Sequence, residues 1–207
     1  MSAEAPNSRL ETFSDGVFAI ALTLLVLEFK TPDAGAIPTS ADLWHALARM
    51  WPALVAFLLS FGIIFISWVN QHAFMRAIDR PATPAFIYAN GFLLLSIVLF
   101  PFPTALLAQF GWTDAAPPAV VVYTIANWAQ NVGWLLMTGA ALRPQPLSSS
   151  PGALAAVKEA QKQARMAFFV YPVCITAAFW FPKTVAVFFA LLWTGWVIYG
   201  ITPRQEE

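Results

Sequence analysis

Long apolar runs separated by short polar connections dominate the hydropathy pattern of the chain. Six of these runs are long enough to be candidate membrane spans, because a helix needs roughly 20 apolar residues to cross a bilayer. Their approximate boundaries are 13–29, 51–70, 85–107, 119–142, 166–181 and 184–201. Only Pro182 and Lys183 separate the last two runs, which predicts a tight helical hairpin. The pattern therefore predicts an all-α membrane protein, with one six-helix unit filling residues 1–207.

The longest polar connection, residues 143–165, divides into two parts. Its first half is rich in Pro and Ser and predicts a loop. Residues 153–165 contain strong helix formers and are expected to continue into the fifth span. We find no inverted three-plus-three resemblance of the kind seen in transporter repeats. The start of the chain lacks a basic region and a cleavage site, so the first run is expected to be a retained span.

The distribution of Lys and Arg predicts the orientation in the membrane. With the N-terminus inside, only Lys30, Arg49 and Lys183 would lie on the outer side. The other eight would lie on the inner side: Arg9, Arg76, Arg80, Arg143, Lys158, Lys162, Arg165 and Arg204. Cytoplasmic loops carry the excess of basic residues. We therefore expect both termini in the cytoplasm and a multi-pass protein of the cytoplasmic membrane.

Composition agrees with a bilayer as the main solvent. Hydrophobic residues make up 59% of the chain, charged residues only 11%, and the mean hydropathy is +0.66, whereas about a quarter of a soluble domain is charged. The formal net charge is zero and no basic run occurs, which argues against nucleic acid as a partner. The single cysteine, Cys174, excludes an intramolecular disulfide and a cysteine-based zinc cluster.

Candidate catalytic chemistry is missing from the sequence. It contains no H-E-x-x-H, no Gly-rich phosphate loop and no Gly-x-Ser-x-Gly elbow, and His45 and His72 are expected on opposite sides of the membrane. We therefore expect neither an enzyme nor a cofactor or resident metal. No charged residue lies at the predicted centre of a span, where proton relays and coupled transporters usually carry one. A passive pathway is favoured, and a small secondary or proton-coupled cation transporter is the alternative.

The first span, within "RLETFSDGVFAIALTLLVLEFK", has two different faces. On a helical wheel, at about 100° per residue, one stripe contains Ile20, Thr23, Leu24 and Leu27. Ser14 and Asp15 lie more than about 100° from Ile20 on the same wheel. Two interpretations of the stripe remain open. It can contact lipid or the rest of the bundle, or it can form a hydrophobic constriction of an ion pore that gates by dewetting.

The polar residues of this span also allow two interpretations each. The Thr23 hydroxyl can meet a partly dehydrated cation, or it can bond the carbonyl four residues earlier. Asp15 can be an acid that complements the helix dipole, or part of a buried polar knot, because a buried carboxylate is costly unless it is paired. Candidate partners in the knot are Arg9, Trp68, Asn70, His72 and Asn90.

The opening segment resembles that of the transmembrane protein 175 family, the endolysosomal potassium channels and their bacterial homologues. The resemblance rests first on Arg9 followed by Phe13, Ser14 and Asp15. "SWVNQHAFMRAIDR" and "NGFLLLSIVLFPFPTALLAQF" are similar to the end of the family's second span and to its third span. These pieces cover roughly the first half of the chain. Gln71 departs from the family, where a second histidine is expected in many bacterial members.

The resemblance implies an architecture and a function. Bacterial members are six-helix units that assemble as tetramers, with the first helix of each subunit lining a central pore. It implies that Ile20, Leu24 and Leu27 form the pore constriction and that Thr23 contributes to selectivity. It further implies that Ser14 and Asp15 hold the helix to its own subunit, with His72 and Asn90 as partners. The expected function is a homotetrameric, potassium-permeable channel whose partners are the lipid bilayer and monovalent cations, and which needs no cofactor beyond the permeating ion.

Overall fold

The structure, a computed structural model, describes residues 6–143 and 145–201, with side chains as far as residue 195. Within these residues the chain is all-helical, as predicted, and contains no strand. The α-helices are α1 (Ser8–Leu24), α2 (Ser40–Arg49), α3 (Trp51–Arg76), α4 (Pro84–Val98), α5 (Pro101–Phe110), α6 (Ala116–Ala141), α7 (Pro151–Ala178) and α8 (Pro182–Ile201). Two 3₁₀ turns, η1 (Leu25–Glu28) and η2 (Ala34–Ala36), lie between α1 and α2.

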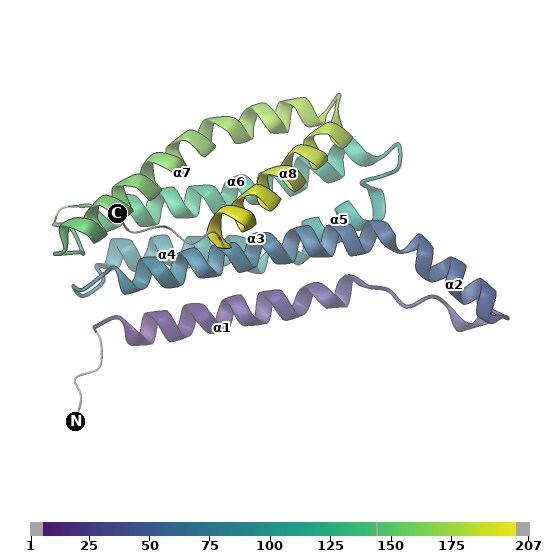
Figure 1. Cartoon of the computed structure of the whole chain (residues 1–207), viewed down its shortest axis with the longest axis horizontal. Helices are drawn as coiled ribbons and strands as arrows, with labels where there is room; N and C mark the ends of the chain where they lie inside the picture. The colour runs from purple at the N-terminus through teal and green to yellow at the C-terminus, as the bar shows by residue number, and fades with distance from the viewer. Residues whose placement is uncertain (1–5, 144, 202–207) are drawn as a thin grey trace.

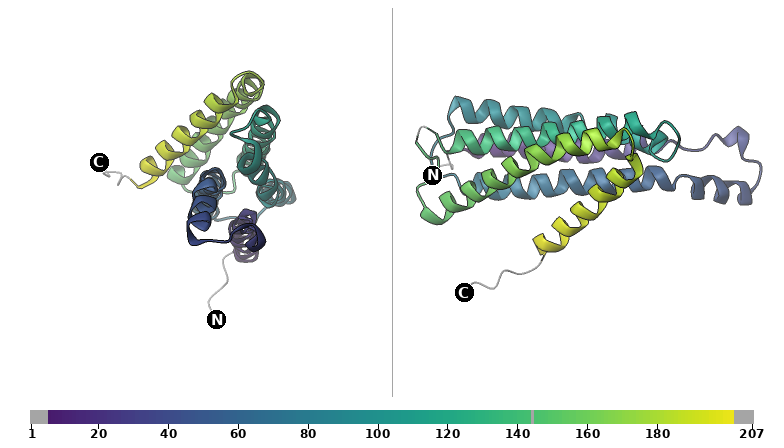
Figure 2. Two further views of the ribbon diagram at one scale, coloured as in Figure 1. Left: turned by 90° about the vertical axis from the view of Figure 1, so that its right-hand side faces the viewer. Right: turned by 90° about the horizontal axis from the view of Figure 1, so that it is seen from above.

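The long helices lie side by side and alternate in direction along the chain (Figure 1). Helix α6 packs against α4, α5, α7 and α8, whereas α1 packs against α3 and α4. Helix α1 therefore lies at the edge of the bundle, and α8 leaves it at an angle on another side (Figure 2). One edge helix with a free face is the feature that positions the candidate site.

Three helices in the described part of the chain are long and apolar enough to cross a membrane. They are Ser8–Glu28, Trp51–Arg76 and Pro84–Phe110, in which α1 is taken with η1 and α4 with α5. Pro182–Gly195 is apolar but shorter. Helix α7 runs unbroken from Pro151 to Ala178, so residues 153–165 are helical and continuous with residues 166–178, as predicted. That residues 166–181 cross a membrane stays a prediction. The count of six spans and the orientation remain predictions, and Arg204, assigned above to the inner side, lies outside the described residues.

The segment predicted as one span, 85–107, is interrupted. Helix α4 ends at Val98 and α5 begins at Pro101. Pro101 and Pro103 have no N–H group to continue an α-helical ladder, and the bonds Phe100 N to Ile97 O and Phe102 N to Leu99 O are 3₁₀-type. The apolar pattern runs across this interruption, so hydropathy alone did not indicate it.

Helix α2 was not predicted, because its apolar residues are too few for a span. Thr39 Oγ1 caps it by accepting a hydrogen bond from Asp42 N at 3.2 Å. Proline near the first turn of α3 to α8 is compatible with a helix start, where the missing N–H has no intrahelical partner. At this end of the bundle Trp51 and Trp112 lie 4.7 Å apart between ring centroids.

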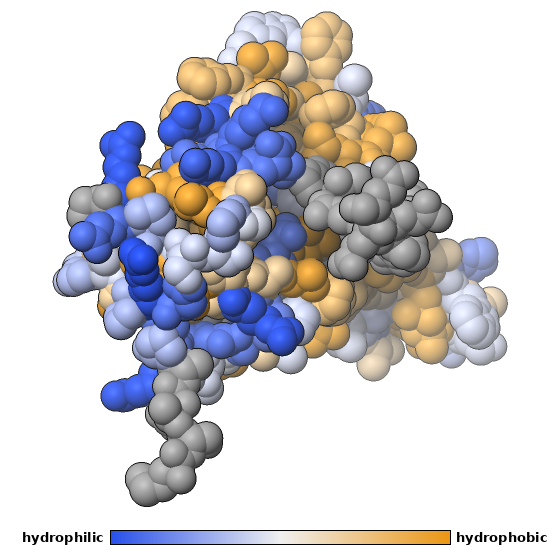
Figure 3. Space-filling model, turned by 60° about the vertical axis from the view of Figure 1, so that its left-hand side comes forward, coloured by the Kyte–Doolittle hydropathy of each residue, from blue (hydrophilic) through white to orange (hydrophobic). Residues whose placement is uncertain are grey.

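Hydrophilic side chains gather at the opposite end of the bundle, where the loops before α4 and α7 meet the start of α1 (Figure 3). We call this set of loop contacts the clasp. The backbone N–H groups of Asp79 and Arg80 both donate to Leu147 O, at 3.2 and 3.1 Å. Ser149 N donates to the Asp79 carboxylate at 3.1 Å, and the Ser149 hydroxyl donates to it as well.

The first helix is joined to the clasp by one side chain. Asn7 Nδ2 donates to Arg80 O at 3.0 Å, and Ala82 N donates to Asn7 Oδ1 at 2.9 Å. Both ends of the Asn7 amide are thereby used, and Asn7 is buried. The start of α1 is fixed to a loop more than 70 residues further along the chain.

Candidate functional site

One face of α1 is packed into the bundle. Ser14, Phe18, Ala21 and Leu25 are buried, and they follow one another at intervals of four, three and four residues. This spacing places them on one side of a helix. Phe18, Ala21 and Leu25 belong to a hydrophobic cluster with residues of α3, α4, α5, α6, α7 and α8. This packed face fixes which side of α1 is left uncovered.

The opposite face of α1 is bare within the single subunit. The exposed fractions are 63% for Phe13, 60% for Ile20, 39% for Leu24 and 70% for Leu27. Thr23 is exposed on the same side. The structure thus places the predicted constriction and selectivity residues together, on a continuous apolar stripe that the subunit itself does not cover. We call Phe13, Ile20, Thr23, Leu24 and Leu27 the α1 stripe.

The last turn of the first span changes its winding. After Leu24 the chain continues as the 3₁₀ turn Leu25–Glu28. Residues i and i+3 eclipse one another in a 3₁₀-helix, so Leu27 stays directly in line with Leu24. An ideal α-helix, which the wheel assumed, leaves these two residues about 60° apart. The turn therefore narrows the stripe at its C-terminal end.

The Thr23 hydroxyl bonds within its own helix. Thr23 Oγ1 donates to Ile20 O at 2.8 Å, three residues earlier rather than the four that the sequence suggested. The donor is thereby used, and the hydroxyl oxygen accepts no hydrogen bond from the described residues. Its lone pairs therefore remain available to a hydrogen-bond donor or a cation from outside the described residues.

The buried side of α1 carries a set of polar contacts to α3 and α4, which we call the anchor. Trp68 Nε1 donates to Asp15 Oδ1 at 2.8 Å. Asn90 Nδ2 donates to Ser14 Oγ at 3.0 Å, and Ser14 Oγ in turn donates to Leu10 O at 2.8 Å. Ser14 and Asp15 are therefore each bonded to a side chain of a neighbouring helix, on the side of α1 away from the α1 stripe.

A second contact between α1 and α3 lies one helical turn away. His72 Nδ1 is 3.2 Å from Glu11 Oε1, close enough for an ion pair but not aligned as a hydrogen bond. His72 also stacks on Trp68, with 5.8 Å between ring centroids. The partner of His72 is therefore Glu11, and neither Ser14 nor Asp15 contacts it through a hydrogen bond. Sequence reasoning missed Glu11, although the four-residue spacing of Glu11 and Asp15 matches that of Trp68 and His72.

Gln71, the residue that departs from the family pattern, is part of the anchor. It is fully buried, and its Nε2 donates to Asn90 Oδ1 at 3.4 Å. Asn90 thus bridges α3 and α1, because its amide nitrogen reaches Ser14. Gln71 Oε1 has no partner among the described residues.

Two residues proposed for the knot lie elsewhere. Arg9 is exposed and makes no ion pair or hydrogen bond in the described part of the chain. Asn70 is also exposed and lines a cavity on the far side of α3. Across residues 6–143 and 145–201, no three His, Cys, Asp or Glu side chains are grouped to hold a metal ion.

Comparison with known proteins places this arrangement in a family. Residues 9–101, which include α1, the anchor and α4, match the profile of the endosomal/lysosomal potassium channel TMEM175. The crystal structure of a lysosomal potassium-selective channel TMEM175 homolog from Chamaesiphon minutus superposes with a TM-score of 0.75. It is 35% identical, over 90% of this chain and 97% of that one. The chain belongs to the TMEM175 family.

Two curated relatives carry the name potassium channel. One, from Chamaesiphon minutus, is 45% identical over 58% of this chain, and one from Streptomyces collinus is 39% identical over 62%. The alignments span 58% and 61% of the lengths of these relatives. Helices α6 to α8 lie outside the part that matches the TMEM175 profile, whereas the α1 stripe and the anchor lie inside it.

Proposed function

We propose that the chain forms a potassium-permeable cation channel of the cytoplasmic membrane, in which the α1 helices of four identical subunits surround a central pore. The observation that carries the proposal is the bare α1 stripe. An apolar face lies on the edge helix of the bundle, while the polar residues of the same helix are turned inward and bonded. A helix in this arrangement is held firmly by its own subunit and presents its other side to an axis.

Symmetry explains why several copies are needed. One subunit offers one stripe, and an ion path requires helices on all sides of an axis. Closed rotational symmetry supplies them from identical subunits. Four copies is the number that the family resemblance implies. The six spans and the cytoplasmic termini predicted from the sequence belong to this proposal.

Each stripe residue has a part in the proposed path. Ile20, Leu24 and Leu27 would form successive apolar rings, which oppose the passage of water and ions until the pore widens. Thr23 would place a hydroxyl oxygen between the first two rings. An apolar ring offers few ligands to a cation, so the selectivity for potassium over sodium is expected to be modest. The names of the potassium channels that the chain resembles support the choice of ion.

Flux through the purified protein tests the proposal. Proteoliposomes loaded with potassium salt should show a voltage-driven potassium flux that needs no gradient of a second ion, with a protonophore present to balance the charge, and that does not saturate at low potassium concentration. A pore-plugging variant, Leu24→Trp, should abolish this flux while leaving the subunit folded, because the residue is exposed in the subunit. Flux that requires a proton or sodium gradient would instead identify the alternative, a coupled cation transporter, and would overturn the channel.

A further inference from the structure

One face of α7 carries basic residues that continue in line into apolar ones. The residues of this face are all exposed, and they are Lys158, Lys162, Arg165, Phe169 and Val173. At about 100° per residue they fall within roughly 80° of one another around the helix axis. Helix α7 is unbroken, so the basic half and the apolar half keep this alignment. We call these five residues the α7 stripe.

The α7 stripe faces away from the bundle. The buried residues of α7, Val157, Ala164, Cys174 and Ala178, are centred roughly opposite the stripe on the same helix. Helix α7 packs against α6 and α8, whereas α1 packs against α3 and α4. Figure 1 shows α7 and α1 at opposite edges of the bundle. In the proposed assembly, with α1 at the axis, the α7 stripe therefore faces lipid.

The basic half of the α7 stripe has more positive charge than the helix neutralises. Within α7, which the structure describes in full, Glu159 is the one acidic residue. Its Oε2 lies 3.9 Å from Lys162 Nζ, and its Oε1 accepts a hydrogen bond from Gln163. Lys158 and Arg165 make no ion pair among the described residues. Like charges four residues apart, such as Lys158 and Lys162, destabilise a helix, and an anion bound between them relieves this repulsion.

The position of the α7 stripe along the helix matches a membrane boundary. The apolar run 166–181 begins directly after Arg165 and is shorter than the roughly 20 residues that span the hydrocarbon core. A short span draws its flanking basic residues to the boundary, where their long side chains reach the head groups. In the predicted orientation this boundary is that of the cytoplasmic leaflet, which carries anionic lipids.

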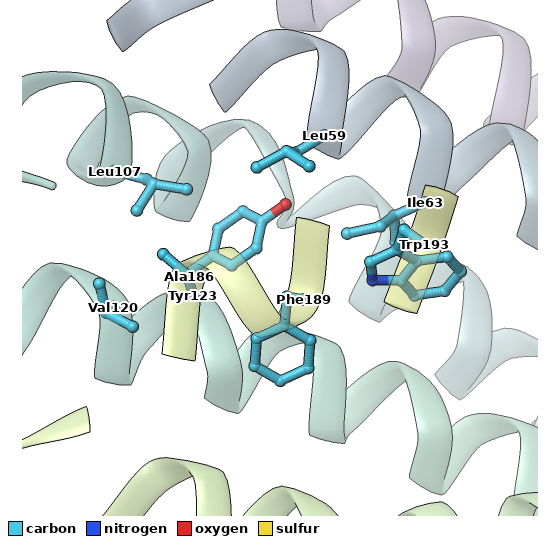
Figure 4. A pocket seen from close by; sticks show the side chains of 8 residues that line it. All are labelled: Leu59, Ile63, Leu107, Val120, Tyr123, Ala186, Phe189 and Trp193. Atoms are coloured by element: carbon cyan, nitrogen blue, oxygen red, sulfur yellow. The ribbon is translucent and has the colours of Figure 1, made fainter. Parts of the chain in front are cut away.

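The interior of the bundle beside α8 has no room for an acyl chain. The cavity between α3, α5, α6 and α8 has a volume of only about 10 Å³, which holds about one water molecule at most. Figure 4 shows its lining, in which Tyr123 lies among aliphatic side chains. The Tyr123 hydroxyl is already bonded to Ser60 at 3.1 Å. A lipid at this side of the molecule therefore binds on the surface.

We propose that the α7 stripe binds an anionic phospholipid of the cytoplasmic leaflet. The phosphate pairs with Lys162 and Arg165 and lies close to Lys158, while one acyl chain lies along Phe169 and Val173. A water-soluble phosphate would use the basic half alone, whereas a phospholipid uses both halves of the stripe. The proposal rests on the membrane-spanning position of α7 in the proposed function, and it does not depend on conduction.

Photolabelling of the full-length protein in detergent micelles tests the proposal. The probe is phosphatidylglycerol with a diazirine in one acyl chain, and the matched neutral probe is phosphatidylcholine with the same diazirine. Labelling by phosphatidylglycerol should saturate and should map to the segment of α7 that contains Phe169 and Val173. Phosphatidylcholine should label this segment about tenfold less, the factor that corresponds to 1.4 kcal/mol.

Competition identifies the part of the lipid that is bound. Unlabelled phosphatidylglycerol should displace the probe, because it carries both the phosphate and the acyl chains. Glycerol 3-phosphate, which has the phosphate without acyl chains, should not displace it. Raising the salt concentration to about 1 M should weaken the labelling, since the Debye length then falls to about 3 Å.

Two double variants provide a matched pair. Lys162→Gln combined with Arg165→Gln removes two charges from the α7 stripe and should weaken the saturable labelling about tenfold. Arg76→Gln combined with Arg143→Gln removes two exposed charges at the ends of α3 and α6 and should leave the labelling unchanged. All four residues are exposed, so both proteins are expected to fold.

The proposal fails if phosphatidylcholine labels α7 as strongly as phosphatidylglycerol, or if labelling is spread evenly over the exposed helices. Parent-like labelling of the α7 double variant would overturn it. An equal loss in the control pair would also overturn it, because net charge alone would then explain the binding. Displacement by glycerol 3-phosphate would indicate a site for a soluble anion instead. No ion flux is measured, so a protein that does not conduct can still show the lipid site, and a conducting protein can lack it.

Discussion

Asp15 keeps its place through one strong contact. Its carboxylate accepts from Trp68 Nε1, and a hydrogen bond to a charged acceptor is roughly twice as strong as a neutral one. The dipole of α1 favours Glu11 instead, which is the acidic residue of the first turn. The tryptophan ring also lies between His72 and Phe65, with centroid distances of 5.8 and 5.6 Å. Trp68 therefore holds Asp15 by a hydrogen bond, and its aromatic neighbours hold the Trp68 ring in place.

Trp68→Phe keeps an aromatic ring but removes the donor. The Asp15 carboxylate then loses the one side-chain donor that the described residues give it, and the folded state should lose about 1–3 kcal/mol. Thermal unfolding in detergent measures this loss. The control is Trp180→Phe, at an exposed tryptophan, which should leave the unfolding temperature unchanged. Equal behaviour of the two variants would show that the anchor does not hold α1.

The α1 stripe predicts the effect of smaller side chains on conduction. Ile20→Ala or Leu24→Ala widens an apolar ring in the proposed pore. If the barrier falls by about 1.4 kcal/mol, the flux of potassium rises about tenfold, and sodium should be less well excluded. The measurement is flux or single-channel current. Val26→Ala serves as the control, since Val26 is exposed but lies off the stripe. Parent-like currents in both stripe variants would place the constriction elsewhere.

Helices α4 and α6 approach each other closely at one glycine. A Cβ built on Gly133 would lie 2.8 Å from Leu93 Cα and 3.0 Å from Leu93 Cβ. Small residues let helix backbones approach closely inside membranes. Helix α4 also carries Asn90 of the anchor, three residues before Leu93. The close approach at Gly133 therefore helps to fix the position of the anchor.

Gly133→Ala should force α4 and α6 apart and cost about 1–3 kcal/mol, the usual penalty of overpacking. The loss should appear as a lower unfolding temperature in detergent. Gly91→Ala on α4 is the matched control, because a Cβ there meets nothing within 4 Å. That control should be neutral or slightly stabilising, since alanine favours the helix. A stable Gly133→Ala protein would mean that the helices can separate without penalty.

The clasp predicts a pH dependence at the loops before α4 and α7. The hydrogen bonds from the Ser149 hydroxyl and N–H to the Asp79 carboxylate lower the pKa of Asp79 below its ordinary value of 3.8. A lowered folded-state pKa means that the contact stabilises the folded loops at pH values above the ordinary pKa. This stabilisation is lost as the pH falls through the lowered pKa.

Hydrogen exchange at the amide of Ser149 measures the opening of the clasp. Protection should be high at pH 6 and should decrease below pH 4 after correction for the intrinsic exchange rate. Asp79→Asn should reduce protection at pH 6 and remove most of this pH dependence. Asp114→Asn, at an exposed acid beyond α5, is the control and should retain the parent profile. If Asp79→Asn kept the parent's pH dependence of protection at Ser149, the Asp79 carboxylate would not be the group that holds the clasp closed.

On the scale of the whole molecule, the proposed assembly can be tested by cross-linking. The native cysteine, Cys174, is buried. A cysteine added on the surface can therefore be cross-linked without interference from Cys174. Leu24→Cys lies on the α1 stripe and should form disulfide-linked dimers on mild oxidation, because the proposed assembly brings the α1 helices of neighbouring subunits together around an axis. Val173→Cys, on the exposed side of α7, should not. Equal cross-linking at both positions would contradict a central α1 ring.

The sequence predicted the helices better than it predicted their contacts. Periodicity separated the α1 stripe from Ser14 and Asp15, because a single regular helix obeys one angular rule. It did not identify Glu11 as the partner of His72, since that pairing depends on how α1 and α3 are aligned. The break before Pro101 was missed because the apolar pattern crosses it. The cavity that Asn70 lines, between α3, α6 and α7, was missed for a further reason, that a space between three helices leaves no local pattern in any of them.

The span of sequence between Asp15 and Trp68 has a consequence for synthesis at the ribosome. The two residues are 53 positions apart, so α1 emerges and meets the insertion machinery while its carboxylate still lacks the indole that will bind it. A single helix that carries Glu11 and Asp15 near one end is unstable in the bilayer interior while it has no partner helix. We expect α1 to reach its final depth only after the second long helix has been translated. The first half of the chain is thereby expected to insert as a helical pair, with the nascent α1 remaining free to shift in depth until Trp68 arrives.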